Sequence, residues 1–565
     1  MKLKLPKSIV GVKFPRVCTI ELNGFDIDLL LPSLFFAILS EGRGKKHANN
    51  PKNIAKFIDN LIQHESLEGF NDPEGRKVLE RFVRTALITT GGVGRSGKDE
   101  QITSIIPYTL LAHKPGFPTT SSLIRGVDTF IYQQLREQLG DNNLRNFVKM
   151  VFGRGVVINP LPELGGKYDG ETKLDTLTRL SIAFLDGFEN TRPGREREKN
   201  VSGPCPRLAK EFATDLLRYL FEYHQTMPIQ AFTHHLLILI NFELFNYTLK
   251  LVHSVNELVQ NPAKLPAAMD EDRKISPPQL YLDFTEAASG YSQEMAKACV
   301  RRDIETYQQF LESNLLLRQL NVYVEKLKRN PRKKAALEKV LSPTLTGAEY
   351  LQGLLLLRHD PEIRRDIAAL ASSEEDEIRQ LNTQEGEEDD PEALSWLDAM
   401  IDTAEDEVER AITLLVEAQR GNAVKNIIQW YWSAGGLKKP QGILRGAPTN
   451  RKSWRYAPTN DVLAALVQLA AVRLGKPTKQ ENGESVQPIR LQEFLQFLEE
   501  RFGILVDRPP APFEGAEYTA AARDNLRAML RRLRQMGIFR DLSDDFTVQR
   551  LHPPYAGQEL KGVRA

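Results

Sequence analysis

Apolar residues recur every three or four positions through most of this chain, which is the spacing that places them on one face of an α-helix. The pattern is clear over 50–64, 73–90 and 121–140. Two longer stretches, 229–259 and 291–329, continue it for about thirty residues or more without Gly or Pro, as in a helix bundle or a helical arm. The sequence therefore predicts a mainly α-helical protein.

One short region departs from this pattern. In "VCTIELNGFDIDLLL", residues 17–31, β-branched and apolar residues alternate with polar ones around Asn23-Gly24. Asn-Gly is a preferred dipeptide of two-residue hairpin turns. We therefore expect a β-hairpin and a short β-rich start within residues 5–31.

Changes in composition divide the chain into expected domains. Loops rich in Gly and Pro at 154–205 separate a mostly helical start from the long helices. An acidic stretch then separates the long helices from a basic C-terminal part. The expected domains are 1–200 (mostly helical with a short hairpin), 201–345 (long-helix bundle or arm), 346–425 (helical with an acidic stretch) and 426–565 (basic aromatic linker plus winged-helix domain).

The C-terminal part has the order of elements found in a winged helix. Helical patterns at 459–474, 489–504 and 518–537 are followed by two expected short strands within 538–554. In the third helix a buried stripe is expected at Leu526, Met529, Leu530 and Leu533, with arginines on the other faces.

Arginines exposed on such a helix suit phosphate contacts and the major groove of duplex DNA. A surface helix that only contacts proteins has the same pattern, so both interpretations stay open. The basic residues expected at a nucleic-acid surface here are Arg523, Arg527, Arg531, Arg532, Arg534, Arg540 and Arg550.

The segment 421–460 is basic and aromatic, with seven Lys and Arg and no acid, and its Gly, Pro and Asn predict much loop. Its aromatic residues either stack on bases or, as at Trp430, Tyr431 and Trp432, anchor the end of a helix in the core. The expected phosphate-binding residues are Lys438, Lys439, Arg451, Lys452 and Arg455.

Charge is distributed unevenly, although the net charge of the 565 residues is only +1. Residues 371–420 hold 17 Asp and Glu against 3 Lys and Arg, whereas 421–565 hold 22 Lys and Arg against 14 Asp and Glu. A basic end favours a polyanionic partner, and the acidic stretch alternatively solvates a helix or neutralises that end.

Three scattered cysteines fit a reducing cytosol, and the start of the chain lacks the apolar core of a signal peptide. The most apolar stretch, 234–245, is too short to cross a bilayer and predicts a buried helix. We therefore expect a cytoplasmic protein without a membrane partner.

A glycine-rich segment at 87–101 has the spacing of a phosphate-binding P-loop at Gly92, Gly97 and Lys98. Asp99 stands where the magnesium-binding hydroxyl belongs, and the preceding residues have a helical pattern. We expect a glycine hinge between helices, in which Arg95 and Lys98 contact phosphate at most. A divergent P-loop NTPase that uses Lys98 is the second alternative.

No recognised catalytic motif or metal-ligand spacing occurs elsewhere in the chain. The histidines lie singly or as the adjacent pair His234-His235, which point to different faces of a helix. We therefore expect a chain that is not an enzyme and uses no cofactor and no metal.

A mainly helical chain without catalytic motifs and with the C-terminal segment "RKSWRYAPTNDVLAALVQLAA…LRQMGIFRDLSDDFTVQRLHPPY" resembles the non-enzymatic components of bacterial anti-phage operons of the methylation-associated defence system type. This resemblance implies work beside an ATPase, a methyltransferase or a nuclease supplied by other chains. The winged-helix part is also similar to the small helical partners of condensin-like ATPases, in which that module binds protein.

Two functions follow as hypotheses. The first is a DNA-binding or scaffold subunit of a bacterial defence or DNA-processing assembly, which contacts double-stranded DNA through 421–455 and 523–550. The alternative is a scaffold whose winged helix binds a partner ATPase rather than DNA.

Overall fold

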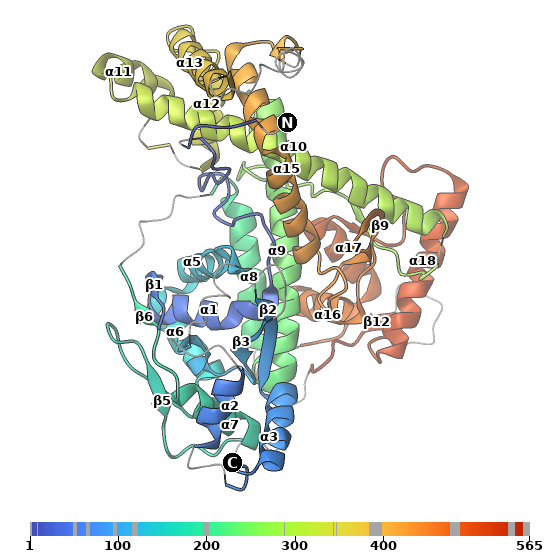
Figure 1. The fold of residues 1–565 in the computed structure, drawn as a ribbon. Helices are drawn as coiled ribbons and strands as arrows, with labels where there is room; N and C mark the ends of the chain where they lie inside the picture. Colours follow the sequence, from blue (N-terminus) through green and yellow to red (C-terminus); the bar gives the residue numbers. More distant parts are fainter. Residues whose placement is uncertain are drawn as a thin grey trace.

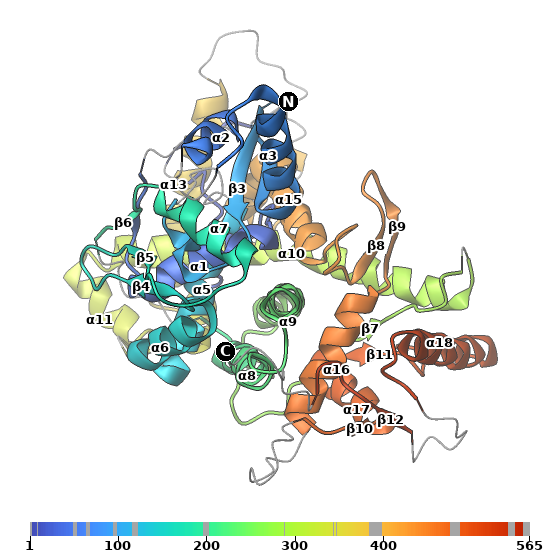
Figure 2. The same ribbon diagram turned by 90° about the horizontal axis from the view of Figure 1, so that it is seen from below.

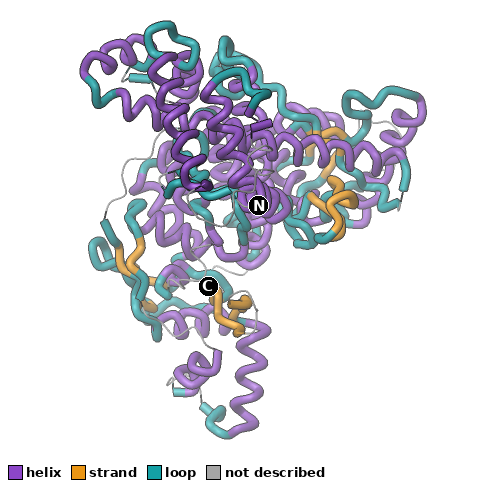
Figure 3. Tube along the Cα trace, turned by 45° about the horizontal axis from the view of Figure 1, so that its top comes forward, coloured by secondary structure: helices purple, strands orange, loops and turns teal. Residues whose placement is uncertain are grey.

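The computed structural model is mainly helical, and its described strands form small two-stranded sheets (Figures 1 and 3). The structure describes residues 3–7, 9–48, 54–63, 68–93, 99–115, 123–195, 203–287, 289–342, 344–345, 347–383, 398–399, 401–474, 486–540 and 549–556.

The N-terminal part combines short helices with two-stranded antiparallel sheets. Its helices are η1 (Ile27–Leu29), α1 (Leu30–Leu39), α2 (Ile54–Ile62), α3 (Pro73–Ala86), η2 (Leu110–His113), α5 (Val127–Leu139), α6 (Asp141–Phe152) and α7 (Thr176–Asp186). Its strand pairs are β1 (Lys45–Lys46) with β6 (Arg192–Pro193), β2 (Ile88–Val93) with β3 (Asp99–Ile105), and β4 (Val156–Ile158) with β5 (Gly166–Tyr168).

The hairpin expected within 5–31 is wrong. The described residues of that segment contain no strand, and its backbone bonds to distant parts of the chain. The amide of Glu21 donates to the carbonyl of Arg125, and the amide of Phe25 donates to Ser433 Oγ. Partners elsewhere replace the second strand that the Asn23-Gly24 turn would supply.

The segment 87–101 also differs from its prediction. Helix α3 ends at Ala86, strand β2 leads into the glycines, and β3 begins at Asp99 and returns antiparallel. A P-loop needs a helix after its lysine. The described residues of the segment therefore belong mainly to two paired strands rather than to a hinge between helices, and the P-loop alternative lacks its structural context.

The two very long helices that the sequence predicts are present, and they form the centre of the molecule. They are α9 (Ile229–Gln260) and α10 (Tyr291–Leu327), and α8 (Pro206–Tyr223) runs beside α9 (Figures 1 and 2). By length and composition α9 could cross a membrane, but 89% of its most apolar window is buried inside the protein. The prediction of a buried helix at 234–245 is confirmed.

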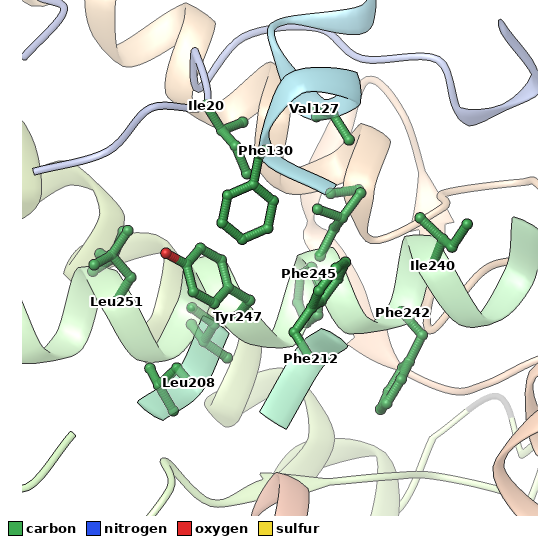
Figure 4. Close-up of a cluster of buried hydrophobic side chains, with 14 of the residues drawn as sticks. Ile20, Val127, Phe130, Leu208, Phe212, Ile240, Phe242, Phe245, Tyr247 and Leu251 are labelled. Carbon is green, nitrogen blue, oxygen red and sulfur yellow. The ribbon is translucent and has the colours of Figure 1, made fainter. Parts of the chain in front are cut away.

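Helix α9 is buried because aromatic rings from several elements converge on it. In Figure 4 the ring of Tyr247 lies next to Phe130 of α5, with ring centroids 4.8 Å apart. Phe212 of α8 packs against Phe130 at 5.4 Å. This core is continuous from Ile9 to Leu551. A second, smaller core holds together α2, α3, α7 and the β2–β3 hairpin.

An arm extends from the second half of α10 (Figure 1). Two of its helices begin at capping residues: Asn330 Oδ1 accepts from the amide of Arg332, and Asp406 Oδ1 accepts from the amide of Glu409. The helices of the arm are α11 (Pro331–Val340), α12 (Gly347–Leu357), α13 (Arg364–Thr383) and α15 (Glu407–Ala434), the last of which returns to the centre.

The C-terminal part follows α15. It begins with the hairpin β8 (Leu444–Ala447) and β9 (Asn450–Tyr456), then α16 (Asn460–Leu474), β10 (Ile489–Arg490), α17 (Leu491–Phe502), β11 (Ile504–Leu505), α18 (Ala516–Gln535) and β12 (Arg550–Leu551). Strand β10 pairs antiparallel with β12, and Leu551 also bridges to Phe539. Strand β11 pairs parallel with β7 (Leu280–Tyr281), which ties this part to the centre. The four expected domains stay a prediction.

Candidate nucleic-acid interface

Helix α18 divides into an apolar and a basic face as its sequence predicts. Leu526, Met529, Leu530 and Leu533 are buried. The exposed arginines of the helix are Arg523, Arg527, Arg531 and Arg534. Two have partners at the surface, since Arg527 Nη1 lies 2.9 Å from Asp524 Oδ1 and the guanidinium of Arg534 covers the ring of Phe539. Exposed ion pairs of this kind are weak, so a phosphate can replace the carboxylate.

Arg532 behaves differently from its neighbours. It is buried, and its guanidinium donates to the carbonyl oxygens of Pro458 and Phe284 and to Glu286 Oε1, at 3.1, 3.2 and 2.9 Å. Burial lowers the pKa of Arg532, while the carboxylate of Glu286 opposes this. Because its N–H groups donate to acceptors inside the protein, Arg532 does not belong to the exposed basic surface.

The β8–β9 hairpin carries the second basic set. Arg451 and Lys452 are exposed near its tip, and the turn projects from the body in Figure 2. Arg455 is mostly covered, and its Nε lies 3.4 Å from Asp283 Oδ2. Arg451 and Lys452 are therefore the two predicted residues of this strand whose side chains reach solvent.

The aromatic residues of this segment mainly serve the core. Trp430 and Tyr431 are fully buried at the end of α15, and Trp430 Nε1 donates to Thr248 Oγ1 at 3.1 Å. Trp454 is also buried, whereas Trp432 keeps 38% of its surface exposed. The anchoring interpretation is confirmed for Trp430 and Tyr431. Loop occurs at 435–443, between the last turns of α15 and the β8–β9 hairpin.

The structure brings the two basic sets to the same end of the molecule (Figure 2). Glu286 links them, because its Oε1 lies 2.9 Å from Arg532 of α18 and 3.7 Å from Arg445 of β8. The segment that carries Glu286 also bonds to both elements: Asp283 donates its amide to the carbonyl of Tyr456, and Phe284 donates its amide to Asn525 Oδ1. The sequence offered no signal for Glu286, which lies in a short connection before α10.

Two further predicted residues, Lys438 and Lys439, lie in the connection between α15 and β8. Lys439 Nζ bonds to Asp28 Oδ2 at 3.2 Å, and the Lys439 side chain lines a cavity of about 650 Å³. Burial opposes its charge, but Asp26 and Asp28 outweigh burial and raise the pKa of Lys439. Lys438 is exposed beside it.

Two arginines extend the basic surface beyond α18. Arg540 and Arg550 are exposed on either side of residues 541–548, and Arg540 Nε donates to the carbonyl of Gly537. Arg95 and Lys98, the possible phosphate contacts, lie outside the described residues. Within the described part of the chain, no group of three potential metal ligands occurs.

Comparison with protein families decides the class of the protein. The family described as "Methylation-associated defense system protein MAD7" matches residues 7–555. The chain belongs to this family. The resemblance to a methylation-associated defence component is thereby confirmed, and membership of a defence system implies other subunits. No curated protein and no solved structure matches the chain.

Proposed function

We propose that this chain is a non-enzymatic subunit that holds double-stranded DNA within a methylation-associated defence assembly. The observation that carries the proposal is the meeting of two basic elements, α18 and the β8–β9 hairpin, at one end of the molecule. Together they offer exposed cations on a rigid frame, which is the requirement for neutralising neighbouring phosphates.

The order of elements supports a winged-helix interpretation of residues 460–551. Strand β10 lies between the first two helices and pairs with β12, and β12 also meets Phe539 directly after the third helix. In this arrangement α18 takes the place of the recognition helix, and its exposed arginines face the groove or the phosphates.

Salt-dependent binding of a DNA duplex tests the proposal. The triple variant Arg527→Ala, Arg531→Ala and Arg534→Ala removes exposed charges and leaves the buried leucine stripe intact. We expect weaker binding and a plot of log affinity against log salt that is shallower by about one for each lost phosphate contact. Fluorescence anisotropy with a labelled duplex over a range of salt concentrations measures both quantities.

The control is a double variant that removes two exposed arginines far from α18, Arg364→Ala with Arg365→Ala at the start of α13, and it is compared with the double variant Arg527→Ala and Arg531→Ala. The control variant should bind like the unaltered chain. Binding that ignores both salt and the α18 substitutions contradicts the proposal. Capture of an ATPase partner by a chain that binds no duplex would favour the protein-only scaffold.

A further inference from the structure

A polar cavity of about 340 Å³ lies between α9 and the first half of α10. Helix α9 supplies one wall and α10 another, and residues of the connection 267–278 complete it. The cavity is large enough for a metabolite of modest size. The proposed DNA-holding role uses none of its residues.

Three basic side chains line this cavity: Lys250, His253 and Arg302. Lys250 is almost completely buried, and its Nζ donates to the carbonyl of Arg501. Arg302 Nε and His253 Nε2 lie 2.9 and 3.4 Å from Oδ1 of the buried Asp303, so these two basic side chains share one carboxylate. Among the residues that line the cavity the only acid is Glu257, which is exposed at the surface.

Burial of Lys250 has an electrostatic consequence. Burial lowers the pKa of Lys250, and the positive charge of Arg501 lowers it further, while nearby carboxylates oppose both. An anion in the cavity would favour the protonated lysine by direct attraction. The wall therefore gains a favourable interaction when a negative group enters.

Asn256 gives the cavity a second property. The residue is 96% buried, and Nδ2 donates to the carbonyl of Thr306 at 2.9 Å. This bond leaves Oδ1 as an acceptor, and Oδ1 has no hydrogen-bond partner among the described residues. A buried acceptor without a donor costs free energy, so a ligand that donates there is favoured.

We propose that this cavity binds a small anion that also carries hydroxyl groups, with the basic side chains holding the anionic group and Asn256 accepting from a hydroxyl. Sugar phosphates and hydroxycarboxylates share this chemistry. The site is independent of the proposed DNA surface, so either proposal can fail alone.

Calorimetric titration of the full chain tests the site with ribose 5-phosphate and with malate in separate arms. We expect saturable binding of at least one of them, and no binding of ribose, which lacks the anion, or of acetate, which lacks the hydroxyl. The arm that binds more tightly identifies phosphate or carboxylate as the anionic group. Absence of saturation by both up to about 10 mM would overturn the proposal.

Two substitutions at exposed lining residues give opposite expected signs. Gln309→Glu adds a negative charge at the cavity and should weaken binding about three- to tenfold, whereas Glu257→Gln removes one and should strengthen binding by a similar factor. Both side chains are exposed, so the fold is expected to tolerate the changes.

Arg301→Gln is the matched control, because it lowers the net charge by one, as Gln309→Glu does. Arg301 is exposed on the same helix and does not line this cavity. The control should bind the ligand like the unaltered chain. Equal weakening by Arg301→Gln and Gln309→Glu would show a general charge effect and overturn the site.

Discussion

At the scale of single residues, consecutive arginines of α18 have opposite roles. Arg531 is exposed, whereas Arg532 is buried and donates to two backbone carbonyls and a carboxylate. A buried carbonyl that loses its donor retains the cost of its lost hydration. The side chain of Arg532 therefore contributes to stability, and that of Arg531 is available for a partner.

Arg532→Met and Arg531→Met should separate these roles. We expect Arg532→Met to lower the free energy of unfolding by about 2 kcal/mol or more, because three acceptors lose their donor. Arg531→Met should change it by less than about 0.5 kcal/mol and should weaken duplex binding instead. Urea denaturation followed by circular dichroism measures the first quantity. Equal stability of the two variants would contradict the assignment of Arg532 to the interior.

Local sequence predicted α18 well because its stripe of Leu and Met depends only on helical spacing. The local sequence did not separate the buried Arg532 from the exposed arginines, because the two carbonyl oxygens to which Arg532 donates lie 74 and 248 positions away in the chain. It also gave no sign that Lys439 pairs with Asp28, which is 411 positions distant. The basic residues were predictable as a set, but the positions of Arg532 and Lys439 were decided by long-range contacts.

At the scale of elements, the β8–β9 hairpin depends on one glycine. Gly446 has φ of +148°, and a Cβ there would lie 2.7 Å from Trp454 Cδ1 and 3.0 Å from the carbonyl oxygen of Ser453. The strand register shifts at this position, which marks a bulge. Neither the hairpin nor its bulge was expected from the Gly, Pro and Asn of this segment, whose composition is equally typical of a loop.

Alanine substitutions at two glycines should therefore have opposite effects on stability. Gly446→Ala should destabilise the chain by about 1–3 kcal/mol, because the new methyl group meets Trp454 and the backbone is strained. Gly421→Ala should stabilise it by about 0.5–1 kcal/mol, because Gly421 lies inside α15 and a Cβ there meets nothing within 4 Å. Chemical denaturation of both variants measures the effects. A stabilising Gly446→Ala would show that the bulge is absent in solution.

At the scale of the whole molecule, the start of the chain links the arm to the centre. The amide of Lys4 donates to Asn382 Oδ1, and Asn382 Nδ2 donates back to the carbonyl of Lys4, at 2.9 and 3.0 Å. Further along, Asn314 Nδ2 donates to the carbonyl of Val12 at 2.7 Å, and Ile9 and Phe14 are buried. A segment that the sequence predicted mainly as a short β-rich start thus holds together helices more than 300 positions away.

Removal of residues 1–13 should loosen the arm selectively. We expect faster amide hydrogen exchange in α13, in the second half of α10 and in the first half of α15, because they lose hydrogen bonds and apolar cover. Exchange in α16–α18 should stay unchanged, since those helices pack at the other end of the molecule (Figure 1). Hydrogen exchange read by mass spectrometry resolves these helices separately. Lys7→Ala is the control, because it alters one exposed side chain and leaves the backbone in place. Unchanged exchange in α13 after the deletion would show that the arm holds its position through its own helices, and a uniform increase that includes α16–α18 would show that the N-terminal segment stabilises the entire fold.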